Sequence, residues 1–481
     1  MQIKLRVIFL VIIFSVLPFV SLLGQDEKKA GELFKQAQLL LQQDQFEEAR
    51  VIFNQIIKKY PGTTYATQSQ EYVTDNALLK VTPLVNNGRP QNRINIVIMG
   101  DAYKYLNKQQ KNYSQAAGQM PREFYKEPTF EEYASYFNIY RVNIASKDAN
   151  VDSDLKECDT ALGGYLKGRT PGVDMSKVQE YCAKLAFRVD VTWVVLQGDG
   201  SVSIGGPGLL VTFAGFNALV HETGHALVRL GDEYIGAGGP DPGDVNISDT
   251  SDPTKVPWAH WLTDPKLAKL LKIGVFERGD GTKVWRPTPG TCEMATPMVG
   301  YCPVCREHAV RSIYRFINPI DERAPNKEIV KLKVTKVVSK DKEKISYKFP
   351  KSEKSPCWLI PLQPATHKLQ VKWYLKESSL SEADDLIKSN SPITDSRGYA
   401  GFKLEGRELA ASRYLGRDKR WVEYPDFSTT SLAPGYYILT AQVKDEPFSM
   451  VQTTKVPWVI KNEPNFLEEH IAWGLEVTEA R

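Results

Sequence analysis

The stretch "LVHETGHALVRLGDEY", residues 219–234, holds two histidines four residues apart, with a glutamate beside the first. Residues at i and i+4 of a helix lie on nearly the same face about one turn apart, so His221 and His225 can present their imidazoles to one metal ion. Glu222 projects about a quarter turn away, which places it near a water on the metal as a general base. The pattern predicts a zinc centre on a helix.

The segment after this helix offers a candidate third ligand. We expect Leu230 to end the helix, Gly231 to take a left-handed turn, and Asp232 to come back toward the metal. Glu233 is the alternative ligand if the turn runs differently. A zinc ion with three protein ligands and one open position lowers the pKa of bound water toward about 7 and polarises a carbonyl. The competing interpretation is an ordinary amphipathic helix whose histidines only form hydrogen bonds.

The composition is that of a globular protein with two or three domains. The chain has 481 residues, 42% of them hydrophobic and 25% charged. Its 61 basic and 57 acidic residues are mixed along the sequence and give a formal net charge of +4. No long basic run is present to follow a phosphate backbone, so nucleic acid is not the expected partner.

The N-terminus has the pattern of an export signal over residues 1–24. Lys4 and Arg6 precede the apolar run "VIFLVIIFSVLPFVSLL", and the small residue Gly24 comes before a polar stretch. An uncleaved membrane anchor is the alternative, because the run approaches the length that spans a bilayer. We therefore expect an exported protein of the periplasm, the outer cell surface or the medium.

Residues 25–85 are predicted to be helical. Apolar residues recur at helical spacing on two segments between residues 37 and 57, and the Tyr-Pro-Gly sequence at 60–62 ends the second. This hairpin resembles one tetratricopeptide repeat, although a plain helical hairpin fits as well. A third helix is expected from about Thr67 to Lys80.

Residues 90–318 have the pattern of an α/β domain. The stretches "INIVIMGDAY", "YFNIYRVNIAS" and "VDVTWVVLQGD" are buried-type strands separated by helix-like or polar segments. After a boundary between Asn318 and Asn326, apolar residues alternate with polar ones over 330–334, 369–375 and 437–443. This alternation predicts a β-sandwich of the immunoglobulin-like kind over residues 326–481.

Several motifs together resemble the immunoglobulin A peptidase family of secreted bacterial zinc metallopeptidases, which are similar to the metzincins. They are "GDAY", "FEEYASYFNIYRVNIAS", "HETGHALVRLGDEY", "WAHW", "RP", "CEM" and "YCPVC", between Arg93 and Ile317. The resemblance implies a zincin fold, with zinc held by His221, His225 and Asp232 and with Glu222 as catalytic acid and base. It also implies that Met294 forms a methionine turn beneath the metal, whereas simple core packing is the alternative for this residue.

The chain departs from those patterns at three positions. Metzincins place glycine three residues after the second histidine and a third ligand six residues after it, where this chain has Val228 and Gly231. Ala102 stands in "GDAY" where the family more often has glycine.

Three side chains are candidates for stabilising the oxyanion of a transition state, since a zinc site benefits from a second electrophile. His260 lies between Trp258 and Trp261, and Tyr234 and Tyr301 are the other candidates. A structural histidine that only forms hydrogen bonds is the favoured interpretation of His260.

The cysteines have two interpretations. The six are Cys158, Cys182, Cys292, Cys302, Cys305 and Cys357. Cys302-x-x-Cys305, with Cys292 and His308, has a spacing that fits a structural zinc, but in an exported chain a disulfide that involves Cys292 is favoured. Cys158 and Cys182 are a second candidate pair.

The sequence therefore predicts an exported zinc endopeptidase whose substrate is a protein or peptide. One alternative is a non-catalytic envelope protein that binds partners through its N-terminal helices or its C-terminal sandwich. Another is a zinc amidase that acts on cell-wall peptides. The substrate itself does not follow from the fold, because pocket walls choose it.

Overall fold

The structure, a computed structural model, describes residues 24–153, 156–198, 200, 202–325, 329–339, 342–348, 355, 357–388, 405–427, 430, 432–445 and 467–479. The predicted export signal lies almost entirely outside these residues. The chain forms two compact units. The first holds the described parts of Met1–Asn86, Asn95–Lys126 and Phe137–Arg229, and the second those of Asn87–Ile94, Glu127–Tyr136 and Leu230–Arg481.

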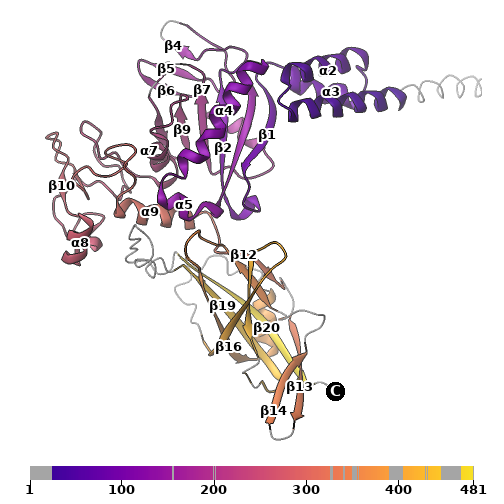
Figure 1. The fold of residues 1–481 in the computed structure, drawn as a ribbon, viewed down its shortest axis with the longest axis vertical. Coiled ribbons are helices and arrows are strands. Elements are labelled where there is room, and N and C mark those ends of the chain that lie inside the picture. The colour runs from indigo at the N-terminus through magenta and orange to yellow at the C-terminus, as the bar shows by residue number, and fades with distance from the viewer. Residues whose placement is uncertain are drawn as a thin grey trace, which may run out of the picture. The chain divides into compact units, whose positions relative to one another are not determined.

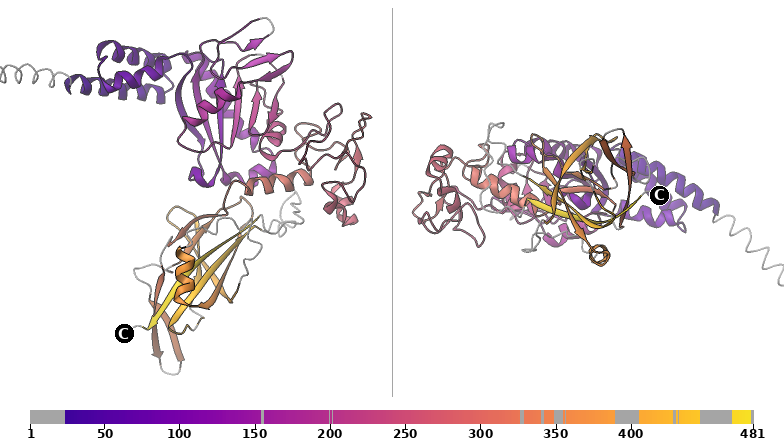
Figure 2. Two further views of the ribbon diagram at one scale, coloured as in Figure 1. Left: turned by 180° about the vertical axis from the view of Figure 1, so that it is seen from behind. Right: turned by 90° about the horizontal axis from the view of Figure 1, so that it is seen from below.

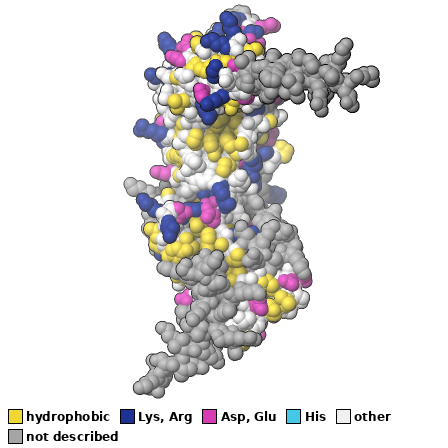
Figure 3. Space-filling model, turned by 90° about the vertical axis from the view of Figure 1, so that its right-hand side faces the viewer, with side chains coloured by type: hydrophobic (Ala, Val, Ile, Leu, Met, Phe, Trp, Pro, Cys, Tyr) yellow, Lys and Arg dark blue, Asp and Glu magenta, His cyan; other side chains and the backbone are white. Residues whose placement is uncertain are grey.

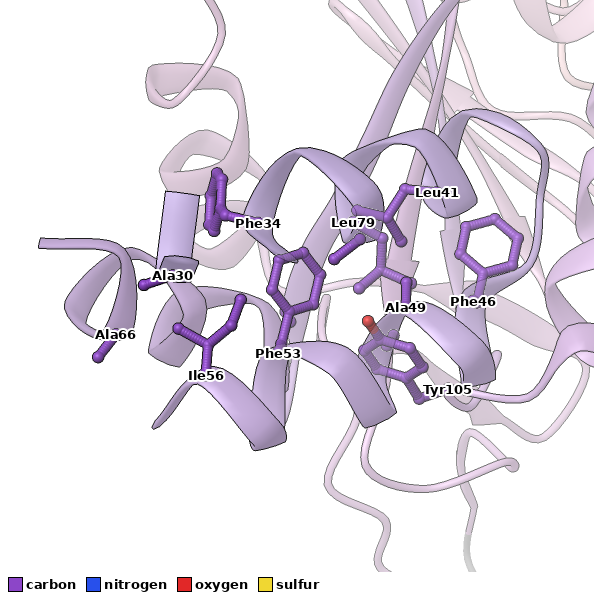
Figure 4. Close-up of a cluster of buried hydrophobic side chains, with 13 residues drawn as sticks. Ala30, Phe34, Leu41, Phe46, Ala49, Phe53, Ile56, Ala66, Leu79 and Tyr105 are labelled. Carbon is purple, nitrogen blue, oxygen red and sulfur yellow. The ribbon is translucent and has the colours of Figure 1, made fainter. Parts of the chain in front are cut away.

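Three helices open the first unit: residues 24–42, α2 (Phe46–Lys59) and α3 (Thr64–Val73). Their apolar faces enclose a cluster in which Phe34 meets Phe53 edge-to-face at 5.5 Å, together with Leu79 of the next strand (Figure 4). Thr63 caps α3 by accepting a hydrogen bond from the Ala66 N–H. The predicted helical hairpin is confirmed.

The predicted third helix, from about Thr67 to Lys80, is wrong in its second half. Helix α3 ends at Val73, and β1 (Ala77–Val85) follows it. Strand β1 pairs antiparallel with β3 (Phe137–Ala145), for example Val81 with Val142. This long-range pairing overrides the local helical pattern.

The first unit is built on a six-stranded sheet in the order β1-β3-β2-β7-β9-β8 (Figure 1). The other four strands are β2 (Ile94–Asp101), β7 (Val191–Leu196), β8 (Ile204–Gly206) and β9 (Leu209–Thr212). Strands β2, β7 and β9 run parallel, and β8 returns antiparallel beside β9. The three strands predicted from the sequence are β2, β3 and β7, so the α/β prediction is confirmed here.

Helices cover both faces of this sheet. On one face, α4 (Asn107–Phe124) lies across the strands (Figure 1), and Phe124 packs edge-to-face on Trp193 at 5.4 Å. On the other face, Val178 of α6 (Met175–Ala183) packs in one cluster with Met99 of β2. Burial on both faces explains the unbroken apolar runs of the central strands. A small three-stranded sheet adds β4 (Asp152–Ser153), β5 (Tyr165–Lys167) and β6 (Thr170–Gly172).

The second unit begins with short elements. They are the 3₁₀ turns Pro90–Asn92, Ala134–Tyr136 and Ala259–Leu262, the helices α5 (Pro128–Glu132), α8 (Pro265–Leu271) and α9 (Pro303–Tyr314), and the strand pair β10 (Phe276–Glu277) and β11 (Trp285–Arg286). Between Leu230 and the start of α9, the described helices and strands are short and are separated by turns and irregular chain.

The C-terminal part of the second unit is a nine-stranded, largely antiparallel, barrel-like sheet in the order β12-β15-β18-β17-β16-β19-β20-β13-β14. Its strands are β12 (Ile320–Ala324), β13 (Val330–Ser339), β14 (Lys342–Lys348), β15 (Trp358–Pro361), β16 (Gln370–Ser378), β17 (Arg407–Leu415), β18 (Trp421–Asp426), β19 (Gly435–Lys444) and β20 (Glu468–Glu479). The three stretches of alternating residues lie in β13, β16 and β19. Helix α10 (Leu380–Lys388) packs on this sheet (Figure 2), where Gly474 leaves room for Ala383.

The strand pairing differs from the two separate sheets of the predicted immunoglobulin-like sandwich. Strand β17 pairs with β16 as far as Leu409 and with β18 from Ala410 onward. Because β17 changes partner along its length, it joins both groups of strands into one sheet. Sequence periodicity reports which residues face inward, but it does not report such a change of partner.

The distribution of charged side chains agrees with the mixed charge pattern of the sequence. On the face drawn in Figure 3, acidic and basic side chains are interspersed. Within the described residues, no helix is long and apolar enough to cross a membrane.

Candidate metal centre

The two histidines of the opening stretch lie on α7 (Leu219–Thr223) and on the π-helical turn Gly224–Val228 that continues it. The His225 and His221 Nε2 atoms are 3.3 Å apart, so both imidazoles point at one region of space. His221 is buried and His225 is half-buried. One widened turn of this kind inside a helix is typical of functional sites.

The helix ends at Val228, two residues earlier than predicted. Arg229, with φ of 64°, takes the left-handed conformation, and its N–H bonds to the Gly224 carbonyl. Gly231 has no positive φ, so the predicted left-handed turn at Gly231 is wrong. It is needed for space instead, since a Cβ at Gly231 would lie 2.4 Å from Ile247 Cδ1 and 2.9 Å from Asp244 Oδ2.

Asp232 completes a group of three donors. The ligand atoms of His221, His225 and Asp232 all lie within 4.8 Å of one another. Glu233 does not join this group, because neighbouring side chains of an extended segment point to opposite sides. Two imidazoles and one carboxylate are a donor set that catalytic zinc accepts.

Glu222 lies beside the edge of the six-stranded sheet, and it is 7% exposed. A Cβ at Gly205 of β8 would lie 2.5 Å from the Glu222 carbonyl oxygen and 3.0 Å from Glu222 Oε2. Only glycine therefore lets the strand approach so closely. The Glu222 carboxylate therefore lies against the edge strand β8.

Residues 82–270 match the model of the IgA Peptidase M64 family, and residues 33–63 match that of a tetratricopeptide repeat. Over these residues the chain is similar to the M64 peptidases. Both resemblances inferred from the sequence are thereby confirmed, and the M64 match supports a peptidase, which acts on proteins or peptides. No curated protein matches the chain significantly.

Two crystal structures of wild-type OgpA from Akkermansia muciniphila resemble the chain weakly. They have 11% and 10% sequence identity, cover 81% of this chain and 93% and 94% of theirs, and give TM-scores of 0.21 and 0.18. TM-scores this low do not establish a shared fold.

The candidate oxyanion donors have different surroundings. His260, in the M64 region, places its Nε2 2.7 Å from Glu307 Oε2, which also accepts a 2.5 Å hydrogen bond from the Trp261 indole. Tyr234 is 43% exposed. Tyr301, beyond the M64 region, is buried, and burial raises the pKa of its hydroxyl well above the ordinary value. Tyr234 is thus the most accessible of the three.

Met294, also beyond the M64 region, is fully buried, and its carbonyl accepts a 2.8 Å hydrogen bond from the Glu233 N–H. Arg286, of the "RP" motif, donates a 2.6 Å hydrogen bond to the Glu233 carbonyl. Both contacts hold the backbone next to Asp232. A place for Met294 beneath the metal remains a prediction.

The cysteines of "CEM" and "YCPVC" form a second group of donors with Glu233, and all six cysteines of the chain are free thiols in the structure. The favoured disulfide is therefore absent, and so is the Cys158–Cys182 pair. His308 is not in the group, which is Glu233, Cys292, Cys302 and Cys305. Burial raises the pKa of the Glu233 carboxyl well above its usual range, and nearby Cys292 adds to this.

Sequence reasoning missed the role of Asp101 in "GDAY". Its fully buried carboxylate accepts hydrogen bonds from the Leu162 N–H (2.9 Å), the Gly164 N–H (2.8 Å) and the Thr160 hydroxyl (2.8 Å). Ala102 has φ of 67°, a conformation that favours glycine. Ala102 is therefore a strained residue in this turn.

Proposed function

We propose that the chain is a zinc-dependent endopeptidase in which His221, His225 and Asp232 hold the metal and Glu222 is the general base. The observation that carries this proposal is the convergence of three donor atoms within 4.8 Å in a chain segment of a peptidase family. The donor set has a charge of −1 with neutral imidazoles, which suits a divalent ion. Bound zinc supplies Lewis acidity, lowering the pKa of a water and polarising the scissile carbonyl.

Glu222 has the surroundings that a general base requires. Its neighbour along the helix is the ligand His221, which fixes the backbone from which the carboxylate projects. Limited exposure strengthens its interactions, because the local dielectric constant is low. In the proposed reaction, Glu222 takes a proton from the attacking water and then passes it to the amine that leaves.

The edge strand β8 is the proposed binding place for the peptide. It ends the order of the sheet, and it pairs with β9 alone among the described strands. An extended peptide can add to such an edge through main-chain hydrogen bonds. The close approach of Gly205 to Glu222 would then bring a bound peptide bond near the general base.

Export and partners complete the proposal. The apolar segment after Lys4 and Arg6 supports export to the periplasm, the outer surface or the medium. The tetratricopeptide-like helices support contact with another protein of the envelope. Under this proposal the C-terminal barrel-like sheet is an accessory module.

The test is digestion of a generic unfolded protein by the purified chain. We expect cleavage by the native protein, loss of cleavage when a chelator is added, recovery on adding zinc, and a fall of about 10²–10⁴-fold in Glu222→Gln. Zinc content in Glu222→Gln should stay at the native level, because this residue is not a ligand.

The same assay separates the two alternatives. Release of peptides from murein fragments, with no cleavage of unfolded protein, would make the chain a cell-wall amidase. Zinc binding without hydrolysis of either substrate would favour the non-catalytic envelope protein and contradict the proposal.

A further inference from the structure

The second donor group joins the chain after α7 to the start of α9, and the described helices and strands between them are short. Glu233, Cys292 and Cys305 are fully buried, and Cys302 is 4% exposed. The four residues come from three segments: the extended chain after α7, the turn at residues 292–296, and the start of α9. A bond among them would hold these segments together.

The distances match those of one tetrahedral zinc ion. Cys292 Sγ and Cys305 Sγ are 3.6 Å apart, and Cys305 Sγ is 3.5 Å from Glu233 Oε1. With zinc–sulfur bonds of about 2.3 Å and zinc–oxygen bonds of about 2.1 Å, tetrahedral edges are roughly 3.8 Å between sulfurs and 3.6 Å between sulfur and oxygen. All four donor atoms lie within 4.8 Å of one another.

An unsatisfied oxygen points to the same conclusion independently. Glu233 Oε1 accepts a 2.9 Å hydrogen bond from Asn246 Nδ2. For the buried Oε2 atom, no hydrogen-bond partner exists among the residues that the structure describes. A buried carboxylate oxygen with no partner is costly, and a cation would remove that cost.

The surroundings orient the donors as supporting groups of metal sites do. Asn246 is itself fixed, because it exchanges hydrogen bonds of 2.9 and 2.8 Å with the backbone of Gly231. Cys302 is the N-cap of α9, where the helix dipole favours a thiolate. Its N–H lies 3.4 Å from Cys292 Sγ and donates to it.

We propose that Glu233, Cys292, Cys302 and Cys305 bind a second, structural zinc ion. A single disulfide would use two sulfurs and leave a thiol and a carboxylate buried together, whereas zinc uses all four donors and leaves no open position. Thiolates also select zinc over the harder divalent cations. The neighbouring acids Asp232 and Glu233 would then serve two separate metal centres.

The test counts metal in the purified full chain by mass spectrometry. We expect two zinc ions per native chain and one in the double variant His221→Ala/His225→Ala. The Cys302→Ser/Cys305→Ser variant should lose one ion, while the control Cys182→Ser, outside the group, should keep both.

X-ray absorption covers the case in which the cysteine variant fails to fold. In His221→Ala/His225→Ala, the remaining zinc should have three sulfur neighbours and one oxygen. A zinc with no sulfur neighbours, no zinc in this variant, or a disulfide between any two of the three cysteines in the unreduced protein would overturn the proposal. Loss of peptidase activity alone would bear only on the first centre.

Discussion

Two groups of histidines in this molecule show how the same side chain can be placed for opposite purposes. His221 and His225 point their Nε2 atoms at one another across 3.3 Å, and His225 is partly open to solvent. His367 is buried, with Nδ1 2.6 Å from Glu132 Oε1 and Nε2 2.7 Å from Asp445 Oδ1. The first arrangement is suited to a cation between the rings, while the second has both ring nitrogens occupied.

The second arrangement behaves as an ion pair with two carboxylates. Burial lowers the pKa of His367, but hydrogen bonds to Asp445 and Glu132 outweigh it and raise the pKa to about 9. The Tyr133 and Tyr314 hydroxyls donate to the other oxygen of Asp445 at 2.6 and 2.7 Å. A histidine held in this way has a structural role. The comparison therefore separates histidines placed to bind a metal ion from a histidine that stabilises the fold through ion pairs.

The largest expected effect is that of His221→Ala. Removal of one of the three proposed ligands should abolish zinc binding at the first centre and peptide cleavage with it, because a catalytic zinc is held by three protein ligands. Metal analysis and the digestion assay measure both losses. His367→Gln is the matched control. Equal losses of zinc and of cleavage in the two variants would show that the two groups of histidines do not differ in role.

His367→Gln should act on stability instead. Two buried carboxylates would lose their cationic partner, which costs on the order of 3 kcal/mol of unfolding free energy at pH 7. Zinc content and cleavage by the folded fraction should stay at native levels. Chemical denaturation at pH 7 measures the change, and an unaltered midpoint would show that the ion pair contributes nothing.

The pH dependence of stability is a second test of the stabilising role of His367. Since the folded-state pKa of His367 lies above its ordinary value of 6.5, its contribution is fully present below about 6.5 and is lost as pH rises through about 9. Native protein should therefore lose stability between these values, and His367→Gln should lose less. Parallel denaturation curves for both proteins from about pH 6 to 10 test the sign.

Gly231→Ala tests how the third ligand is delivered to the histidine pair. The added methyl would overlap the Ile247 side chain, so we expect a loss of about 1–2 kcal/mol in stability and weaker zinc binding. The control is Gly238→Ala, where a Cβ would meet nothing within 4 Å. Native zinc affinity in Gly231→Ala would mean that the position of Asp232 does not depend on the close packing at Gly231.

The smallest expected effect on activity is that of His260→Gln. Because His260 contacts Glu307, we expect a modest fall in stability and less than about a tenfold fall in kcat, the range below that of a general catalytic group. A fall of about 10²-fold or more in kcat with unchanged stability would instead assign His260 to the transition state.

The contacts of His221 and His225 could be predicted from the sequence, whereas those of His367 could not, and the reason is physical. The pairing of His221 with His225 follows from helical spacing, and Asp232 follows from its place just after the helix. The contacts of His367 join residues 235 and 78 positions apart, and no local pattern encodes them. The partnership of Glu233 with the cysteines is equally non-local.

The positions of turns and the pairing of strands were also not predictable from the sequence. The left-handed residue is Arg229, although glycine at 231 was the natural prediction, because glycine serves tight packing as well as positive φ. The strands of the core were predictable from apolar runs. The change of partner along β17 was not, since it depends on the neighbours and not on the strand itself.

The most direct measurement is anomalous X-ray diffraction from crystals of the zinc-loaded protein, recorded above and below the zinc absorption edge. The predicted result is a zinc peak bounded by His221, His225 and Asp232, with none at His367. Zinc-loaded crystals without a peak at the histidine pair would contradict the central claim that these two histidines form a metal centre.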